Sequence, residues 1–219
     1  MPKVDSEKKR ARIEAALGPV RALCRACRLC GRACGVNRLE NEPGYCATDS
    51  RDAEQVRYAS ATLHFGEEPP LVGRGGSGTV FFTHCNLRCV YCQNYQISQF
   101  GLGEDAGYTT LAEDMLGLER AGAENINLVT PTHYIYPILL ALREAYGRGL
   151  TRPLVYNTNG FDRVELLALL DGIVDIYLPD MKYSDPACAL TYSHAEQYPD
   201  VARAAVLEMY RQTGRLRGA

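Results

Sequence analysis

The sequence predicts an α/β fold, a curved parallel sheet of the partial-barrel kind preceded by a cysteine-rich segment. Two patterns lead to this prediction. From about Gly78 onward, short apolar strands alternate with helical segments, as is typical of βα units that form a parallel sheet. Nine cysteines in 219 residues gather into two groups, with only Cys188 outside them. Such clustering favours metal ligation or catalysis over a disulfide scaffold.

Composition and charge exclude several classes of protein. Hydrophobic residues make up 46% of the chain and charged residues 23%, which is ordinary for a globular protein. The 24 basic and 26 acidic residues give a net charge of −2, so we expect neither a nucleic-acid partner nor a membrane partner. The polar first ten residues lack a secretory signal, and no apolar run is long enough to cross a bilayer. We therefore expect a cytoplasmic protein whose thiols stay reduced.

The N-terminal third divides into a helix, a cysteine-rich stretch and a loop. Apolar residues at helical spacing between Ile13 and Leu23 predict an amphipathic helix, interrupted near Gly18 and Pro19. The next stretch is poor in large apolar residues, so we expect it to order around a metal. Glycines and prolines predict a long loop over Tyr58–Gly78. The expected segments are a helix over 1–23, a cysteine-rich metal module with a linker over 24–78, and the partial barrel over 79–219.

Beyond Gly78, four βα units can be counted from periodicity and apolar runs. We expect strands at Thr79–Thr83, Asn125–Thr130, Leu154–Asn157 and Ile173–Leu178. We expect helices at Leu111–Ala121, Ile135–Tyr146, Val164–Leu170 and around Val201–Arg211.

Three cysteines follow the first of these strands. Cys85, Cys89 and Cys92 have the spacing Cys-x3-Cys-x2-Cys, with Tyr91 just before the last. Loops at the carboxyl ends of parallel strands carry the chemistry of such folds, so this loop is expected to face a functional site. Three soft ligands without a fourth nearby suit an iron–sulfur cluster with one open iron. A structural zinc or a chance thiol cluster is the alternative.

This spacing resembles the signature of the radical S-adenosylmethionine superfamily. The resemblance implies a 4Fe-4S cluster on the three thiolates, with S-adenosylmethionine on its fourth iron and the Tyr91 ring against the adenine. It implies an oxidoreductase that cleaves S-adenosylmethionine reductively to a 5′-deoxyadenosyl radical, which abstracts hydrogen from a substrate. It further implies an electron donor such as flavodoxin or ferredoxin.

Four longer phrases narrow the resemblance to an uncharacterised branch related to pyruvate formate-lyase activating enzyme. They are His64–Leu71, Gly76–Phe82, Asn125–His133 and Val174–Tyr183. The resemblance makes a glycyl radical enzyme one candidate protein substrate. It covers most of the chain, although the superfamily usually builds six βα units. With four units and an end at Gly214–Ala219, the barrel is expected to be truncated or minimal.

Two strand ends match motifs of those activating enzymes. Asn157, Thr158 and Asn159, followed by a glycine, resemble their Asp-Thr-Asn-Gly, which faces S-adenosylmethionine; here Asn157 replaces the acid. Asp180 and Lys182 resemble the acid and lysine that lie beside the methionine moiety. A turn or a solvated ion pair is the alternative for each.

The usual Gly-Gly-Glu stretch after the second strand is absent, and Thr130–His133 stands in its place. His133 could titrate near neutrality and act catalytically on substrate, or serve as a structural hydrogen-bonding group. His133 is therefore a candidate catalytic residue.

The N-terminal cysteines form a second candidate metal site. Cys24, Cys27, Cys30 and Cys34 have ferredoxin-like spacing, with Cys46 further along. Resemblance to the same branch favours Cys27, Cys30, Cys34 and Cys46 as ligands, which leaves Cys24 spare. Four thiolates fit a second iron–sulfur cluster or a structural zinc, and disulfides are a third option.

Two further expectations concern charge and function. Arg28, Arg32 and Arg38 could offset thiolate charge, and Cys188 is expected to be a small buried hydrophobe. The alternative function is a non-catalytic iron–sulfur electron carrier or metal-stabilised interaction module.

Overall fold

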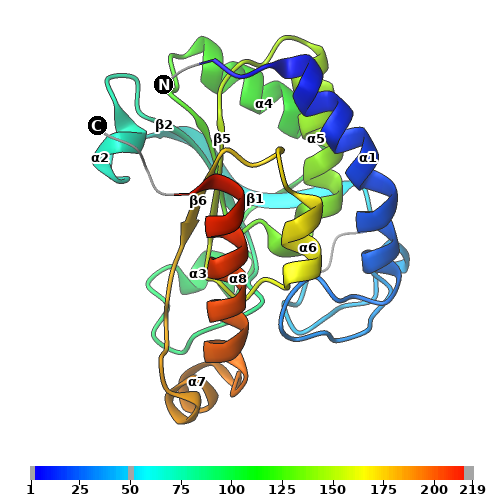
Figure 1. The fold of residues 1–219 in the computed structure, drawn as a ribbon, viewed down its shortest axis with the longest axis vertical. Helices are drawn as coiled ribbons and strands as arrows, with labels where there is room; N and C mark the ends of the chain where they lie inside the picture. The colour runs from blue at the N-terminus through cyan, green and yellow to red at the C-terminus, as the bar shows by residue number, and fades with distance from the viewer. Residues whose placement is uncertain (1–2, 49–51, 215–219) are drawn as a thin grey trace.

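The computed structural model describes residues 3–48 and 52–214, which form a mixed α/β fold around an open six-stranded sheet (Figure 1). The strand order is β3-β1-β2-β4-β5-β6. Strands β2, β4, β5 and β6 run parallel, whereas β1 is antiparallel to both β2 and β3. The strands are β1 (Gln55–His64), β2 (Ser77–Phe82), β3 (Glu104–Gly107), β4 (Ile126–Val129), β5 (Leu154–Thr158) and β6 (Ile176–Pro179).

Helices connect the parallel strands and cover the sheet. Helices α1, α4, α5 and α6 contribute to one large apolar core with the sheet residues Val80, Leu128 and Tyr156. Helix α8 lies against α6 and β6. The helices are α1 (Ser6–Arg25), α2 (Pro69–Val72), α3 (Tyr95–Ser98), α4 (Tyr108–Arg120), α5 (Ile135–Gly147), α6 (Val164–Leu169), α7 (Pro186–Ser193) and α8 (Tyr198–Thr213), with short 3-10 turns η1 (Arg38–Glu40) and η2 (Thr132–Tyr134).

The four predicted parallel strands and their helices are present, and the α/β class is confirmed. The sheet does not close into a barrel. No described helix is long and apolar enough to span a membrane. The end of the predicted barrel segment, residues 215–219, lies outside the described residues.

Two local predictions are wrong. The predicted loop over Tyr58–Gly78 begins inside β1, a strand with Val56 as its one fully buried residue. Hydrophobic alternation is therefore faint in β1, and its pairing with β2 and β3 supplies the order. The predicted interruption near Gly18 and Pro19 is also absent, because α1 continues through both.

Pro19 is tolerated because it lies on the exposed face of α1. Proline removes one backbone N–H donor and disturbs the carbonyl four residues earlier, at Ala15. Ala15 is exposed too, so water can solvate that carbonyl. Ile13 before the proline and Val20 after it are both buried, and their packing keeps the two halves of the helix in line.

The parallel order brings three loops to one edge of the sheet. The loops that follow β2, β5 and β6 all leave from the carboxyl ends of parallel strands, the edge at which such folds bind ligands. Phe81, Val129, Asn157 and Leu178 are in register across this end of the sheet. The fold thus places the loop over residues 83–94, which carries Cys85, Cys89 and Cys92 and is called the three-cysteine loop below, beside both predicted strand-end motifs.

Candidate functional site

The three-cysteine loop leaves β2 through a sharp turn. His84 and Arg88 both adopt left-handed backbone conformations, with φ of 63° and 53°. The His84 N–H donates to the Ile97 carbonyl, and the Val90 N–H donates to the Tyr192 carbonyl in α7. Leu87 is fully buried in a small core with Phe161. Packing and backbone hydrogen bonds therefore fix the loop at both ends.

A cavity of about 190 Å³ lies inside this loop. Its walls come from the three-cysteine loop, α3 and the ends of β2, β4, β5 and β6. The predicted site residues on its walls are Cys85, Cys89, Cys92, Asn157, Thr158, Asn159, Asp180 and Lys182. The structure thus brings together eight residues whose first and last members, Cys85 and Lys182, lie 97 positions apart in the sequence.

The Cys85 sulfur has two polar hydrogens directed at it. The Leu87 N–H and the Asn159 Nδ2 each lie 3.4 Å from Cys85 Sγ. Asn159 Nδ2 also donates to Asn86 Oδ1 over 2.7 Å, which fixes the amide between the two loops. Burial raises the pKa of the Cys85 thiol, and a bound metal would lower it again.

Cys92 has a weaker polar setting. Its sulfur lies 3.2 Å from Ser98 Oγ in α3, so α3 closes one side of the cavity. Cys89 is buried and Cys92 is half-buried. The loop therefore presents three thiols of unequal exposure to one space.

The donor set suits an iron–sulfur cluster in its chemistry. Three soft thiols line one cavity, and two N–H groups point at the Cys85 sulfur, as do the hydrogen bonds that tune the sulfur atoms of such clusters. Across residues 3–48 and 52–214, no three His, Cys, Asp or Glu side chains are gathered closely enough to hold a metal ion. The described residues therefore fit a cluster in their donor chemistry and shared cavity, and their sulfur atoms do not form a converged triad.

Asp180 and Lys182 form an ion pair at the cavity wall. Lys182 Nζ lies 2.6 Å from Asp180 Oδ2, with the lysine side chain one-third exposed. Burial lowers the pKa of Lys182, but the hydrogen bond and charge of Asp180 outweigh it, so this pKa is raised overall. The pair can present a positive and a negative group to a zwitterionic ligand.

Tyr198, which the sequence did not single out, holds the two strand-end loops together. Its buried hydroxyl lies 2.7 Å from the Asn159 carbonyl and 3.1 Å from the Asp180 carbonyl, and it accepts the Lys182 N–H over 2.8 Å. A tyrosine at the start of a helix carries no sequence signal for this role. Only the fold reveals it.

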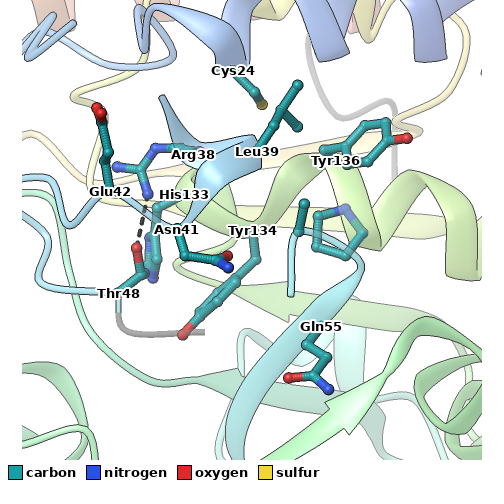
Figure 2. Close-up of a pocket in the computed structure, with 12 residues that line it drawn as sticks. Cys24, Arg38, Leu39, Asn41, Glu42, Thr48, Gln55, His133, Tyr134 and Tyr136 are labelled. Carbon is teal, nitrogen blue, oxygen red and sulfur yellow. Dashed lines mark hydrogen bonds between the residues drawn. The ribbon is translucent and has the colours of Figure 1, made fainter. Parts of the chain in front are cut away.

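His133 lies outside this cavity. It is on the wall of a separate cavity of about 30 Å³, together with Cys24, Arg38 and Thr48 (Figure 2). His133 Nε2 lies 2.8 Å from the Thr83 carbonyl and must donate to it, while Nδ1 has no partner. Burial is the main reason that the pKa of His133 falls to about 3. The imidazole is therefore neutral near pH 7 and serves as a hydrogen-bond donor to the strand that precedes Cys85.

Tyr91 is half-exposed beside the cavity. Its ring contacts those of Tyr183 and Tyr192 edge-to-face, at centroid separations of 6.1 and 6.2 Å. It is not among the residues that line the cavity. The aromatic residue of the motif thus packs between the buried Tyr183 and the exposed Tyr192 and does not line the cavity.

The N-terminal cysteines surround an arginine. Arg38 donates to Cys27 Sγ over 2.9 Å, to Cys46 Sγ over 2.8 Å and to Thr48 Oγ1 over 2.8 Å. Cys27, Cys30 and Cys46 are buried, whereas Cys34 is exposed. Of the three predicted charge-compensating arginines, Arg38 is the one that bonds to sulfur directly.

The two remaining cysteines differ in burial. Cys24 is buried on the inner face of α1, and burial raises its pKa to about 12. Cys188 was expected to be buried but is exposed. It lies in the first turn of α7, near the Asp185 cap, and this helix has only two buried residues.

Comparison with known proteins finds an uncharacterised relative. The chain is 32% identical over 185 residues to the uncharacterised protein MJ0674 of Methanocaldococcus jannaschii, a match that covers 81% of this chain and 51% of that protein. The chain thus spans about half the length of the relative that it matches. No protein-family model and no solved structure matches it.

Proposed function

We propose that this protein is a radical S-adenosylmethionine iron–sulfur enzyme. The supporting observation is that Cys85, Cys89 and Cys92 line one cavity with the polar ends of β5 and β6. Each of these groups was predicted from a separate part of the sequence, and a chance thiol cluster would not require them to meet. The alternative is an iron–sulfur electron carrier or an interaction module stabilised by metal.

The residues that line the cavity would have different binding roles. Cys85, Cys89 and Cys92 would hold a 4Fe-4S cluster, which together with S-adenosylmethionine supplies a 5′-deoxyadenosyl radical for hydrogen abstraction. Asn159 steadies the Cys85 sulfur through its amide. Asp180 and Lys182 would bind the ammonium and carboxylate of the methionine moiety by charge complementarity.

The surrounding residues keep the cavity in shape. Tyr198 links the Asn159 and Asp180 carbonyls through one hydroxyl, which supports a fixed spacing between the loops after β5 and β6. His133 donates to the Thr83 carbonyl at the base of the loop. We assign His133 this positioning role in place of a catalytic one.

The decisive experiment uses anaerobically reconstituted protein with dithionite and S-adenosylmethionine. Release of 5′-deoxyadenosine by the wild type, and its loss together with the iron of this one cluster when Cys85, Cys89 and Cys92 are changed to alanine, would support the enzyme. The matched control is Cys188→Ala, an exposed cysteine far from the loop in sequence, which should keep both. A wild-type protein that binds a cluster but releases no 5′-deoxyadenosine would favour the electron carrier.

The N-terminal cysteines would hold a second metal. We propose Cys27, Cys30, Cys34 and Cys46 as ligands for an iron–sulfur cluster or a zinc ion, with Arg38 as a donor to two of the sulfurs. Such donation stabilises thiolates and so favours metal binding. The substrate of the enzyme would be a protein, such as a glycyl radical enzyme, or a small molecule.

A further inference from the structure

Arg32 connects the N-terminal cysteine segment, residues 24–48, to the three-cysteine loop. Its backbone lies between Cys30 and Cys34, and its guanidinium bonds to the loop that carries the other cysteine group. Arg32 Nε donates to the Asn86 carbonyl over 2.9 Å, and Nη2 donates to the Leu87 carbonyl over 3.3 Å. Two consecutive carbonyls of the three-cysteine loop are therefore bonded to one side chain from the other segment.

The same guanidinium closes the end of α7. Arg32 Nη2 donates to the Ser193 carbonyl over 2.6 Å, and Nη1 donates to the His194 carbonyl. A cation at the carboxyl end of a helix satisfies its unpaired carbonyls and its dipole. Helix α7 in turn accepts the Val90 N–H through Tyr192. Arg32 thus bonds to the loop directly and to the helix that steadies its far end.

Aromatic rings fix the plane of this guanidinium. Its Cζ lies 3.6 Å from the centroid of the Tyr45 ring and 5.4 Å from that of Phe161. Tyr45 directly precedes Cys46, and Phe161 follows Asn159. Stacking of this kind requires a flat group, and a lysine ammonium cannot provide one.

The backbone makes a second set of contacts beside Arg32. The Gly31 N–H donates to the Phe161 carbonyl over 2.9 Å, and the Arg163 N–H donates to the Leu29 carbonyl over 3.2 Å. A β-carbon on Gly31 would lie 2.3 Å from the Phe161 ring. The N-terminal segment therefore packs closely against the loop that carries Asn159.

We propose that Arg32 is a positioning residue that clamps the three-cysteine loop to the N-terminal cysteine segment, so that order in one supports order in the other. This inference rests on the proposed function for the purpose of the clamp, but the clamp itself is a property of the folded chain. One planar fork bonds four carbonyls from two separate segments. Loss of the fork leaves carbonyls of a mostly buried region without a donor, which is costly.

The test is hydrogen exchange on the full chain without added metal. Arg32→Gln should speed exchange of the Leu87 and Val90 amides by roughly tenfold or more, as expected for the loss of hydrogen bonds to a charged group. Arg32→Lys should behave like Arg32→Gln, because it keeps the charge and loses the fork. Arg28→Gln is the matched control, since Arg28 is exposed in the same segment, and it should exchange as the wild type does.

A second measurement follows cluster retention. After reconstitution, the Arg32 variants should lose iron to a chelator several-fold faster than the wild type and Arg28→Gln. Wild-type exchange at Leu87 and Val90 in Arg32→Gln, or full recovery in Arg32→Lys, would overturn the clamp. A wild type that binds no iron at all would instead overturn the proposed function, and the exchange result would still decide the role of Arg32.

Discussion

Asp180 and Lys182 show how two residues adjacent to a strand end can serve a ligand and each other. Their ion pair is partly exposed, so its own contribution to stability is small. The pair is more informative as a binding element, because both side chains line the cavity. Removal of the ion pair should therefore weaken ligand binding and leave the free energy of unfolding nearly unchanged.

We predict that Asp180→Ala or Lys182→Ala weakens S-adenosylmethionine binding to the reconstituted protein by about 10-fold or more, since each removes a charge-assisted contact. The cluster content should stay at the wild-type level. Titration calorimetry gives the affinity, and iron analysis gives the content. Arg203→Ala, which removes the exposed ion pair to Asp200, is the control, and equal affinity in all four proteins would contradict the assignment.

His133 makes the stability of the protein depend on pH. Its pKa of about 3 lies below the ordinary value near 6.5, so the unfolded chain binds more protons between these values. Stability from the neutral imidazole is therefore complete above about pH 6.5 and is lost as the pH falls toward 3. The slope approaches about 1.4 kcal/mol per pH unit inside that window.

We predict that wild-type protein loses its stability advantage over His133→Gln between pH 6.5 and pH 4. Urea unfolding at several pH values measures the difference in unfolding free energy. Above pH 7 the difference should be constant. A difference that stays constant down to pH 4 would show that His133 is not buried as a neutral group.

The residues that line the cavity could be predicted from the sequence because they belong to short local motifs. The spacing of Cys85, Cys89 and Cys92 is a signal within eight residues, and Asp180 with Lys182 is another. Tyr198 and Arg32 have no such signal, because their partners lie up to 162 positions away. His133 misled for the same reason, since the sequence shows a polar loop and only the fold shows which cavity the ring faces.

Among the elements, periodicity predicted those whose own residues bury an apolar face. Helix α5 has nine buried residues and β4 has three in four, so both were found close to their observed bounds. Strand β1 and strand β3 were not found, because pairing rather than burial sustains them: β3 has no fully buried residue. Tertiary pairing of this kind leaves little trace in a single sequence.

Gly160 lies where the loops after β5 and β6 meet. Its φ is +77°, and a β-carbon there would lie 2.6 Å from the Asp180 carbonyl oxygen. Backbone atoms cannot rotate away as a flexible side chain can. Only glycine therefore lets Asn159 and Asp180 approach as they do.

We predict that Gly160→Ala lowers the free energy of unfolding by about 1 kcal/mol or more beyond the loss in Gly149→Ala. Gly149 also has a positive φ, +99°, but nothing lies within 4 Å of a β-carbon placed on it. Both variants carry a backbone cost of roughly 1–2 kcal/mol, and only Gly160→Ala adds a steric clash. Urea unfolding of both variants gives the difference, and equal losses would mean that the two loops can separate freely.

Across the whole molecule, the N-terminal cysteine segment is the part with the least conventional support. Between Cys24 and Thr48 its regular structure is the end of α1 and the short turn η1, and η1 has no buried residue. Ordering a chain costs roughly 1–2 kcal/mol per residue, whereas a structural metal can contribute about 10 kcal/mol or more. A bound metal would offset much of that cost. Because Arg32 bonds to the three-cysteine loop, order in the N-terminal segment would then also stabilise that loop.

We predict that protein with Cys85, Cys89 and Cys92 all changed to alanine retains metal through Cys27, Cys30, Cys34 and Cys46. Elemental analysis should find residual iron if the site is an iron–sulfur cluster and residual zinc if it is structural. Treatment with a chelator should then open residues 24–46 to protease, because the segment loses the ligand around which it orders. Changing Cys24 to alanine in the same background is the control and should leave the metal in place. A segment that held neither metal and still resisted protease would contradict the prediction and leave Arg32, Arg38 and the packing against Phe161 as its support.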